Sequence, residues 1–270
     1  MPVIATNTAA NSAIRFLNNN TSSAASSVSK LASGSRIVRA SDDAAGLAIS
    51  TKLTSDVTSL KQAGTNAAQA ASVLQVADGG LARVSDVLQR LKALASQALS
   101  GSVTDSERDY IDAEFQALKS EVTGIETTTT FNGDSLIDGT YNENYFVGLG
   151  ASGAVNVIAA DLSTVNVPVI AGDTQSSANA STAVAALDAN IVTVSTARAT
   201  VGALISRFET RGSQIATSVE NISAANSQIK DVDLAAEQTR LVSANVLTQA
   251  AVSALSQANQ IPQSLLRVLQ

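Results

Sequence analysis

The residues best able to do chemistry lie in one stretch, SGSRIVRASDDAAGLAIS, at positions 33–50. It carries two arginines, Arg36 and Arg39, and two adjacent carboxylates, Asp42 and Asp43. Paired carboxylates catalyse acid–base reactions when both can reach the same substrate. Adjacent residues of a helix point to different sides, so this pair suits helix capping better than catalysis.

Other catalytic arrangements are missing from the sequence. The chain has no cysteine and no histidine, which excludes thiol nucleophiles, disulfides and imidazole proton transfer. No phosphate-binding GxxxxGK motif occurs, and GLGASG at 148–153 lacks a flanking strand and helix, so it is interpreted as a turn. The sequence therefore predicts no catalytic residue, no cofactor, no metal site and no enzyme.

Composition limits the partners and the shape. The net charge of −6 gives no positive field for nucleic acid, and no apolar run is long enough for a membrane span. The amino-terminal segment lacks the pattern of a secretory signal peptide. Hydrophobic residues make up 45% of the chain but aromatic residues only 3%, so the core must be thin. Long helices packed through small aliphatic side chains satisfy this condition and favour a rod.

Aliphatic residues repeat with the 3–4 spacing of a coiled-coil seam in two segments. The first seam changes phase at Asp78-Gly79-Gly80, and we expect the helix to continue because a helical glycine costs only about 1 kcal/mol. The second helix is expected to follow Thr104, a cap residue with carboxylates in the next turn. The seams are Leu53, Val57, Leu60, Gly64, Ala67, Ala71 and Leu74, then Leu81, Val84, Leu88, Leu91, Ala95 and Ala98, and finally Ile111, Phe115, Leu118, Val122 and Ile125.

The middle of the chain predicts turns and short strands. Asn132-Gly133 and Asp138-Gly139 favour turns, and short β-prone runs follow, so one or two hairpins are expected. One heptad frame from Val184 to Ile229 predicts the longest helix. Three positions of this frame lack an aliphatic or aromatic group: Arg198, Gly212 and Asn226.

The two chain ends carry narrow stripes rich in Ala and Ser. Such stripes are too weak to hold an isolated helix of this length against backbone entropy. Two interpretations stay open: the ends pair within a monomeric bundle, which the sequence slightly favours, or they become ordered only on assembly. The stripes are Ile14, Leu17, Thr21, Ala24, Val28 and Leu31, and Leu241, Ala244, Leu247 or its neighbour, Ala251, Leu255, Ala258, Leu265 and Leu269.

Several blocks of the sequence carry a resemblance to one family. They are LASGSRIVRASDDAAGLAIS at 31–50, FNG at 131–133, STARATVGALISRFET at 195–210, NISAANSQIKDVDLAAE at 221–237 and the ending VSALSQANQIPQSLLRVLQ. In their order and content these blocks resemble the bacterial flagellins, the subunits of the flagellar filament. They cover most of the chain outside about 140–180.

The resemblance implies a mainly α fold. It is an elongated antiparallel helical bundle or coiled coil, formed by the N- and C-terminal segments, with a small β-hairpin region in the middle. Residues 1–42 and 226–270 would form a terminal coiled coil lining an inner tube, and residues 43–225 an outer tube. A short variable surface region is expected at about 139–180. The implied function is a structural subunit that polymerises into the filament, the propeller for swimming.

The linker between the first two helices is the expected inter-subunit site. Ser33-Gly34 would end the first helix, and Ser41 would cap the next helix with two carboxylates on its dipole. The arginines would be free to meet carboxylates of adjacent subunits, because a polymer needs complementary faces that do not close. In the alternative interpretation both arginines are solvated and contribute little. The expected contact residues are Arg36, Arg39, Asp42 and Asp43.

A second expected site follows from the resemblance. LQRLKALASQA at 88–98 resembles the family segment read by the flagellin-sensing Toll-like receptor. The alternative is ordinary bundle surface, since several of these residues also serve the helical seam. The matching residues are Arg90, Leu94, Gln97 and Glu114.

The resemblance also implies partners and a location. The chain would bind copies of itself in a helical homopolymer, and would meet the flagellar export chaperone and the hook-junction and filament-cap proteins. It would be extracellular, exported by the flagellar type III apparatus without a cleaved signal peptide. Two other classes stay open: a junction or cap-associated protein with similar ends, and a coiled-coil signalling rod such as a chemoreceptor stalk. A flagellin-like chain with a metalloprotease insert would need a His-Glu-x-x-His motif, and this chain has no histidine.

Overall fold

The computed structural model describes residues 6–150 and 154–268, with side chains as far as residue 260. The chain divides into two compact units. Unit 1 comprises Met1–Ser55 and Asn221–Gln270, and unit 2 comprises Asp56–Glu220. The prediction of a mainly α fold with a small antiparallel strand region is confirmed. The assignment of residues 1–42 and 226–270 to an inner tube, and of 43–225 to an outer tube, stays a prediction.

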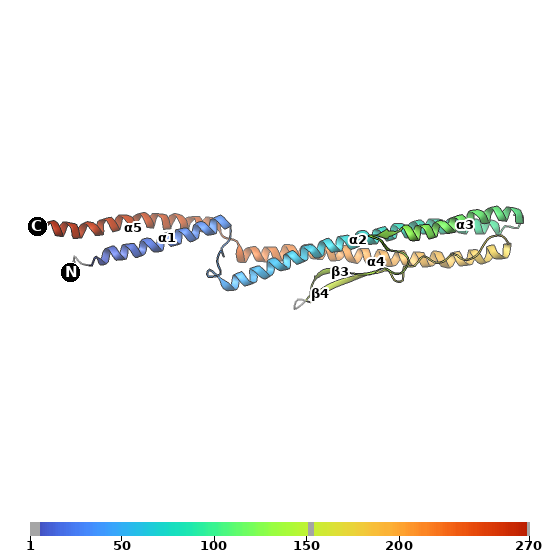
Figure 1. The fold of residues 1–270 in the computed structure, drawn as a ribbon, viewed down its shortest axis with the longest axis horizontal. Helices are drawn as coiled ribbons and strands as arrows, with labels where there is room; N and C mark the ends of the chain where they lie inside the picture. Colours follow the sequence, from blue (N-terminus) through green and yellow to red (C-terminus); the bar gives the residue numbers. More distant parts are fainter. Residues whose placement is uncertain (1–5, 151–153, 269–270) are drawn as a thin grey trace. The chain divides into compact units, whose positions relative to one another are not determined.

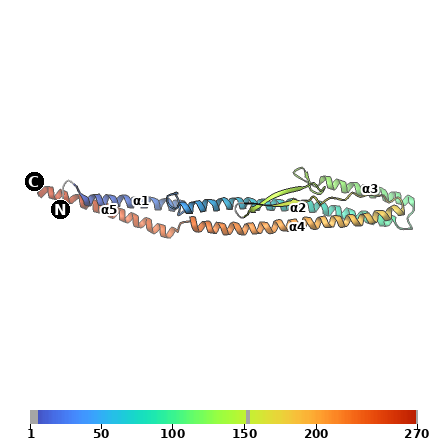
Figure 2. The same cartoon turned by 90° about the horizontal axis from the view of Figure 1, so that it is seen from below.

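Unit 1 is built on a helix pair. Helix α1 (Thr8–Ser33) lies beside helix α5 (Leu234–Val268) in both views (Figures 1 and 2). The pair is antiparallel, because Asn7 donates to the Ala258 carbonyl at one end and Ser27 donates to Glu237 towards the other. The side chain of Asn7 also caps α1 by accepting from the backbone of its first turn. As predicted, α1 ends at Gly34, which takes the left-handed conformation with φ 67°.

The face that α1 turns towards α5 differs from the predicted stripe. Ile14 and Val28 were expected in the seam but are 43% and 51% exposed. The seam keeps Leu17, Ala24 and Leu31 of the stripe. Its other positions lie one residue earlier than predicted, since two helices approach closely only where the facing side chains are small. The buried and half-buried residues of α1 at this seam are Ala10, Ala13, Leu17, Asn20, Ala24, Ser27 and Leu31.

On α5 most of the predicted stripe is confirmed. Its buried and half-buried positions include Leu241, Ala244, Ala251, Leu255 and Ala258. Between them the neighbour Thr248 is half-buried, whereas Leu247 is exposed. The predicted stripe positions 265 and 269 lie outside the described side chains.

Unit 2 is built on three helices. Within this unit, residues 56–98 of α2 (Ala44–Ala98), helix α3 (Asp105–Thr128) and residues 177–220 of α4 (Ser177–Lys230) run side by side (Figures 1 and 2). The order of two ion pairs, Asp78 with Arg198 and Lys92 with Asp188, makes α2 and α4 antiparallel. Helix α2 continues through the glycine pair as predicted.

The prediction for α4 needs two corrections. The helix begins at Ser177 rather than at Val184, because the Ser176 hydroxyl accepts from the Asn179 N–H and caps the first turn. It has 54 residues and α2 has 55, so it is not the longest helix. Two of the three residues that interrupt the predicted heptad frame have polar partners. Arg198 pairs with Asp78, and the Asn226 side chain donates to Thr54.

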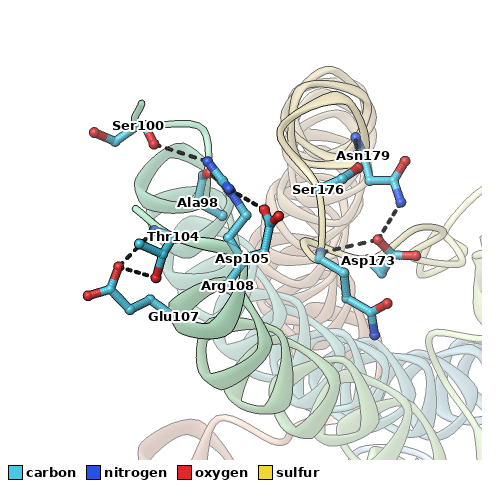
Figure 3. Close-up of polar contacts among 10 residues, drawn as sticks. Ala98, Ser100, Thr104, Asp105, Glu107, Arg108, Asp173, Ser176 and Asn179 are labelled. Carbon is cyan, nitrogen blue, oxygen red and sulfur yellow. Dashed lines mark hydrogen bonds and ion pairs between the residues drawn. The ribbon is translucent and has the colours of Figure 1, made fainter. Parts of the chain in front are cut away.

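The turn from α2 to α3 is closed by side chains, as Figure 3 shows. The Glu107 carboxylate accepts from both the N–H and the hydroxyl of Thr104, so the predicted cap position is confirmed. The backbone bond from Thr104 is the main cause of the lowered pKa of Glu107. Arg108 is buried, and its guanidinium donates to the Ala98 carbonyl at 2.8 Å and to Asp105 at 2.7 Å. These contacts satisfy carbonyl groups that the end of α2 leaves open.

Two hairpins separate α3 from α4, as predicted. Strands β1 (Thr130–Phe131) and β2 (Asp134–Ser135) flank Asn132-Gly133, whose φ angles of 55° and 96° suit this tight turn. Strands β3 (Asn142–Leu149) and β4 (Val155–Asp161) pair antiparallel. The predicted turn at 148–153 falls partly outside the described residues.

The core of unit 2 contains large side chains from all its parts. Tyr145 of β3 packs edge-to-face on Phe208 of α4 with 5.8 Å between ring centroids, which joins the hairpin to the helices. The largest fully buried side chains are Phe115, Phe208, Leu74, Leu81, Leu88, Leu91, Leu136, Ile137, Leu162, Leu187, Val73 and Val84.

Candidate assembly site

The linker from α1 to α2 is paired with the junction between α4 and α5. The Val232 N–H donates to the Gly34 carbonyl at 3.1 Å, and the Arg36 N–H donates to the Lys230 carbonyl at 2.6 Å. Between them, the buried Ser35 hydroxyl donates to Lys230 as well. These bonds hold the residues before α2 in a fixed antiparallel pairing with the residues after α4.

Arg36 is engaged within its own chain. Its Nη2 and Nε donate to the Ile229 carbonyl at 2.8 and 3.2 Å, and its guanidinium lies 3.9 Å from the Asp43 carboxylate. The expectation that Arg36 is free for an adjacent subunit is therefore wrong for the single chain. The reason is local, because the last carbonyls of α4 lack helical partners and the linker pairing brings the guanidinium to them.

The two carboxylates have different roles. Asp42 accepts from the N–H groups of Arg39 at 2.9 Å and Val38 at 3.1 Å, and these two bonds, the Arg39 bond foremost, lower its pKa. Asp43 accepts from the Gly46 N–H at 2.8 Å and caps α2.

The prediction that Ser41 caps α2 is therefore wrong. The turn closed by Asp42 brings Asp43, not Ser41, directly before the first helical residue. A Cβ at Gly46 would collide with the Asp43 carboxylate, so this cap also explains a glycine in the first turn.

Among the four predicted contact residues, Arg39 is the one whose side chain is free of polar partners in the described part of the chain. Within the described part of the chain its guanidinium forms no ion pair and no hydrogen bond. It lines a groove of about 280 Å³ between α1 and the linker. The groove is otherwise lined by small or polar side chains: Ser22, Ala25, Ser26, Ser29, Val38, Ser41 and Asp42. The structure thus brings Arg36 to Asp43 and the backbone of Arg39 to Asp42.

The outer faces of the α1–α5 pair carry apolar side chains. Beneath them the buried apolar residues of the seam are alanines, and the leucines of the seam are only half-buried. The exposed apolar residues of the pair are Ile14, Phe16, Val28, Leu234, Val242, Val246, Leu247 and Val252. Exposed apolar groups on neighbouring faces of a helix pair mark an association surface.

A buried polar pair lies inside the α1–α5 seam, and the sequence analysis missed it. Glu237 is only 4% exposed and accepts from the Ser27 hydroxyl at 2.6 Å and from Arg240 Nη1 at 3.0 Å. The Ser27 bond is the main cause of the lowered pKa of Glu237. A signal existed, because extending the heptad frame of Ala244 and Ala251 back by seven residues reaches Glu237.

The predicted receptor face is partly assembled on unit 2. Arg90 and Glu114 form an exposed ion pair of 2.6 Å between α2 and α3, and Gln97 is exposed on α2. Leu94 is only 2% exposed and belongs to the core, so it is not available at the surface as expected. The cause is the helical seam, which Leu94 joins together with Leu91.

Two features are missing from the residues that the structure describes. They contain no group of three or more acidic side chains placed to hold a metal ion. None of their helices combines the length and the apolar character that crossing a bilayer requires.

Comparison with known proteins gives one family at both ends of the chain. The model of the bacterial flagellin N-terminal helical region matches residues 4–142, and that of the C-terminal helical region matches residues 184–269. A flagellin of Halalkalibacterium halodurans is 37% identical over 89% of this chain and 89% of its own length. A flagellin of Bacillus subtilis is 34% identical over 97% of this chain and 98% of its own length.

Solved structures give a weaker likeness. The crystal structure of Bacillus cereus flagellin shares 28% identity, covers 60% of this chain and 94% of its own, and superposes with a TM-score of 0.49. The family relationship rests on the sequence matches.

Proposed function

We propose, from the premise that this chain belongs to the bacterial flagellin family, that unit 1 is the part of the subunit that polymerisation completes. Family membership makes the chain a structural subunit of the flagellar filament, and its role in motility follows from the family. The proposal concerns which surfaces of this chain form the polymer.

One observation carries the proposal: the contrast between the cores of the two units. Unit 2 buries leucine, isoleucine and phenylalanine completely, whereas the buried apolar side chains described in unit 1 are Ile37 and five alanines. Burial stabilises by about 0.8 kcal/mol per CH₂ group, so a seam of alanine methyl groups contributes little. Other large apolar side chains of α1 and α5, such as Val28 and Val246, are exposed, where neighbouring subunits can cover them.

The linker would then have two tasks. Arg36 and Asp43 hold the linker against α4 and so fix the entry into α2. Arg39 is the residue available for a carboxylate of an adjacent subunit, with Asp42 fixing the backbone on which it stands. In this proposal, residues 1–42 and 226–270 line the inner tube and 43–225 form the outer tube.

Substitution of Val246 tests the proposal. Val246→Asp places a charge on the outer face of α5, and we expect it to abolish elongation from filament seeds followed by electron microscopy. Val192→Asp is the matched control, because Val192 is equally exposed but lies on unit 2. Elongation of Val246→Asp at the parent rate would contradict the proposal.

The linker residues are tested in the same elongation assay. Arg39→Ala is expected to slow filament growth while leaving the helix content of the monomer unchanged, because the side chain has no partner among the residues that the structure describes. Arg36→Ala is also expected to slow growth, but with weaker amide protection around residue 230, since its bonds to Ile229 are lost. Normal growth of both variants at physiological salt would leave the linker without an assembly role.

A second function rests on the exposed pair Arg90–Glu114. We propose that this pair and Gln97 are contacts for the flagellin-sensing Toll-like receptor, without Leu94. The expected result is a response to the parent protein in a receptor-reporter cell line and a weaker response to Arg90→Ala. Silence of cells treated with the folded parent protein would refute this function.

Location and further partners belong to the same proposal. We propose that the chain is exported by the flagellar type III apparatus without cleavage, and meets an export chaperone and the hook-junction and cap proteins on its way. Protein recovered from sheared filaments should then have the mass of the uncleaved chain. A shortened amino terminus in that protein would contradict the export route.

A further inference from the structure

A pair of arginines on α4 has no acidic partner among the described residues of its own chain. Arg207 and Arg211 are four residues apart, so their side chains lie on one face of the helix. Within the described residues neither forms an ion pair, and Arg211 donates only to Gln214, at 3.0 Å. Two like charges at this spacing destabilise a helix, so this pair lacks an explanation within the isolated chain.

The two arginines line a groove. It has a volume of about 460 Å³ and lies between α4 and the strand β4, which contributes the buried Ile158. The remaining lining residues are small or polar: Ala203, Ser206, Thr210 and Gln214. The groove therefore offers two guanidinium groups beside a surface that a small-residue helix face can approach.

Helix α3 carries the opposite charge on its outer face. Most of its carboxylates have partners, but Asp109 and Glu121 are exposed and form no ion pair in the described part of the chain. Between them, Tyr110 is 79% exposed, with the small exposed residues Ala113 and Ala117 on the same face. A tyrosine flanked by alanines and carboxylates fits an arginine groove, since guanidinium groups pair with carboxylates and stack on aromatic rings.

The groove and the α3 face of one chain cannot meet. Glu114 of α3 contacts α2 at Arg90, whereas Ile215 of α4 lies beside α2 at Gly64. Arg198 of α4 contacts α2 at Asp78, so the two arginines of the groove lie beside the part of α2 between Gly64 and Asp78. Asp78 is 12 residues from Arg90, roughly 18 Å along the helix at 1.5 Å per residue. The partner of the groove must therefore come from another molecule.

We propose that the groove formed by Arg207 and Arg211 binds the α3 face around Tyr110 of a second copy of this chain. The contact joins two different surfaces, so it is heterologous and does not close on itself. This property suits a filament, and the inference rests on the proposed polymerisation.

Charge reversal tests the contact. The variant Arg207→Glu/Arg211→Glu and the variant Asp109→Lys/Glu121→Lys are each expected to lower the rate of elongation from parent seeds by about tenfold. None of the four substituted residues is buried in the core of unit 2, and the folding of each variant is checked by thermal unfolding. The variant that carries all four changes restores opposite charges across the contact and is expected to elongate, from seeds of its own sequence, near the parent rate.

Controls separate this contact from general charge effects and from polymerisation itself. Lys61→Glu/Arg83→Glu changes the net charge by the same amount as Arg207→Glu/Arg211→Glu, but at exposed sites outside the groove. This control variant should elongate like the parent. Failure of the parent to elongate would refute the proposed polymerisation, whereas parent-like elongation of both reversed variants would refute only this contact. The contact is also refuted if the fourfold variant is as slow as either reversed variant, or if the control is slowed equally.

Discussion

Replacement of Glu237 by alanine should loosen the α1–α5 pair and leave unit 2 unchanged. The carboxylate is buried in the seam and accepts from Ser27, which is itself buried. After Glu237→Ala the Ser27 hydroxyl loses this partner in a place that water hardly reaches. An unsatisfied buried polar group costs about 1–3 kcal/mol. The opening equilibrium of the pair should rise by about 5- to 150-fold, the factor equivalent to that free energy.

Two further variants separate the charge from the hydrogen bond. Glu237→Gln keeps an oxygen that can accept from Ser27, so it should lose less stability than the alanine variant. The double variant Ser27→Ala/Glu237→Leu removes both polar groups and should be close to the parent in stability, because replacing both partners by apolar groups is nearly neutral. Together with the single variants Ser27→Ala and Glu237→Leu, the double variant gives the coupling between the two residues.

The pH dependence of the pair follows from the same contact. The pKa of Glu237 in the folded chain lies below its ordinary value of 4.5, chiefly because of the bond from Ser27. Its contribution to stability is therefore fully present above pH 4.5 and is lost as the pH falls through the lower pKa of the folded state. The glutamine variant lacks this ionisation and should lose this part of the acid sensitivity.

Hydrogen exchange of α1 and α5 peptides, followed by mass spectrometry, measures the opening of the pair separately from unit 2. Glu209→Ala, at an exposed position of α4, is the control. The reasoning is refuted if Glu237→Ala leaves the protection of α1 and α5 at the parent level, or if Glu237→Gln retains the full acid sensitivity of the parent.

Further predictions concern the stability of unit 2. Asp112 is buried and accepts from the Thr174 N–H at 2.8 Å and from Gln175 at 3.2 Å. Asp112→Ala should therefore lower the free energy of unfolding, measured in urea, by about 1–3 kcal/mol. Asp109→Ala, at an exposed position, is the neutral control. Burial raises the pKa of Asp112, but the hydrogen bonds from Thr174, Gln116 and Gln175 together lower it, so this contribution too should disappear as the pH falls below its ordinary value of 3.8. Gly80→Ala should lower the melting temperature, because its Cβ would lie 2.6 Å from Thr129, a stiff β-branched side chain. Gly79→Ala meets open space and should raise the melting temperature by the helix propensity gained, up to about 1 kcal/mol; the opposite order of the two variants would contradict the packing at this point.

Local signals in the sequence predicted most helix positions. The carboxyl end of α1 and the start of α3 depend on residues next to them, Gly34 and Thr104, and both were recognised, whereas the Asn7 cap at the start of α1 was not. The heptad frames of α2 and α4 were recognised because each buried position recurs at a fixed spacing. The hairpin at Asn132-Gly133 was also predicted, since few residue pairs adopt positive φ at both turn positions.

Features that depend on distant parts of the chain were not predicted. The partner of Arg36 is a carbonyl 193 residues away, which no local pattern indicates. Alternate positions of the α1 seam were placed one residue too late, because Ile14 and Val28 are the more hydrophobic residues while the close approach of α5 selects the smaller Ala13 and Ser27. Leu94 was expected at a surface that its own helical seam buries. In each case the decisive quantity is a distance between two helices.

The small seam of unit 1 has a consequence for the assembled state. Ordering the backbone costs about 1–2 kcal/mol per residue, and alanine contacts such as those of Ala13 and Ala244 return only part of it. A seam of leucines would return more, but it would also move the two helices apart. Exposed side chains such as Val28 and Val246 would still be uncovered within the described residues. We infer that the pair contributes its larger apolar groups to contacts between subunits, and that its remaining stability is gained on polymerisation. The buried bond from Ser27 to Glu237 then serves to fix the register of a pair whose apolar contacts are too uniform to specify it.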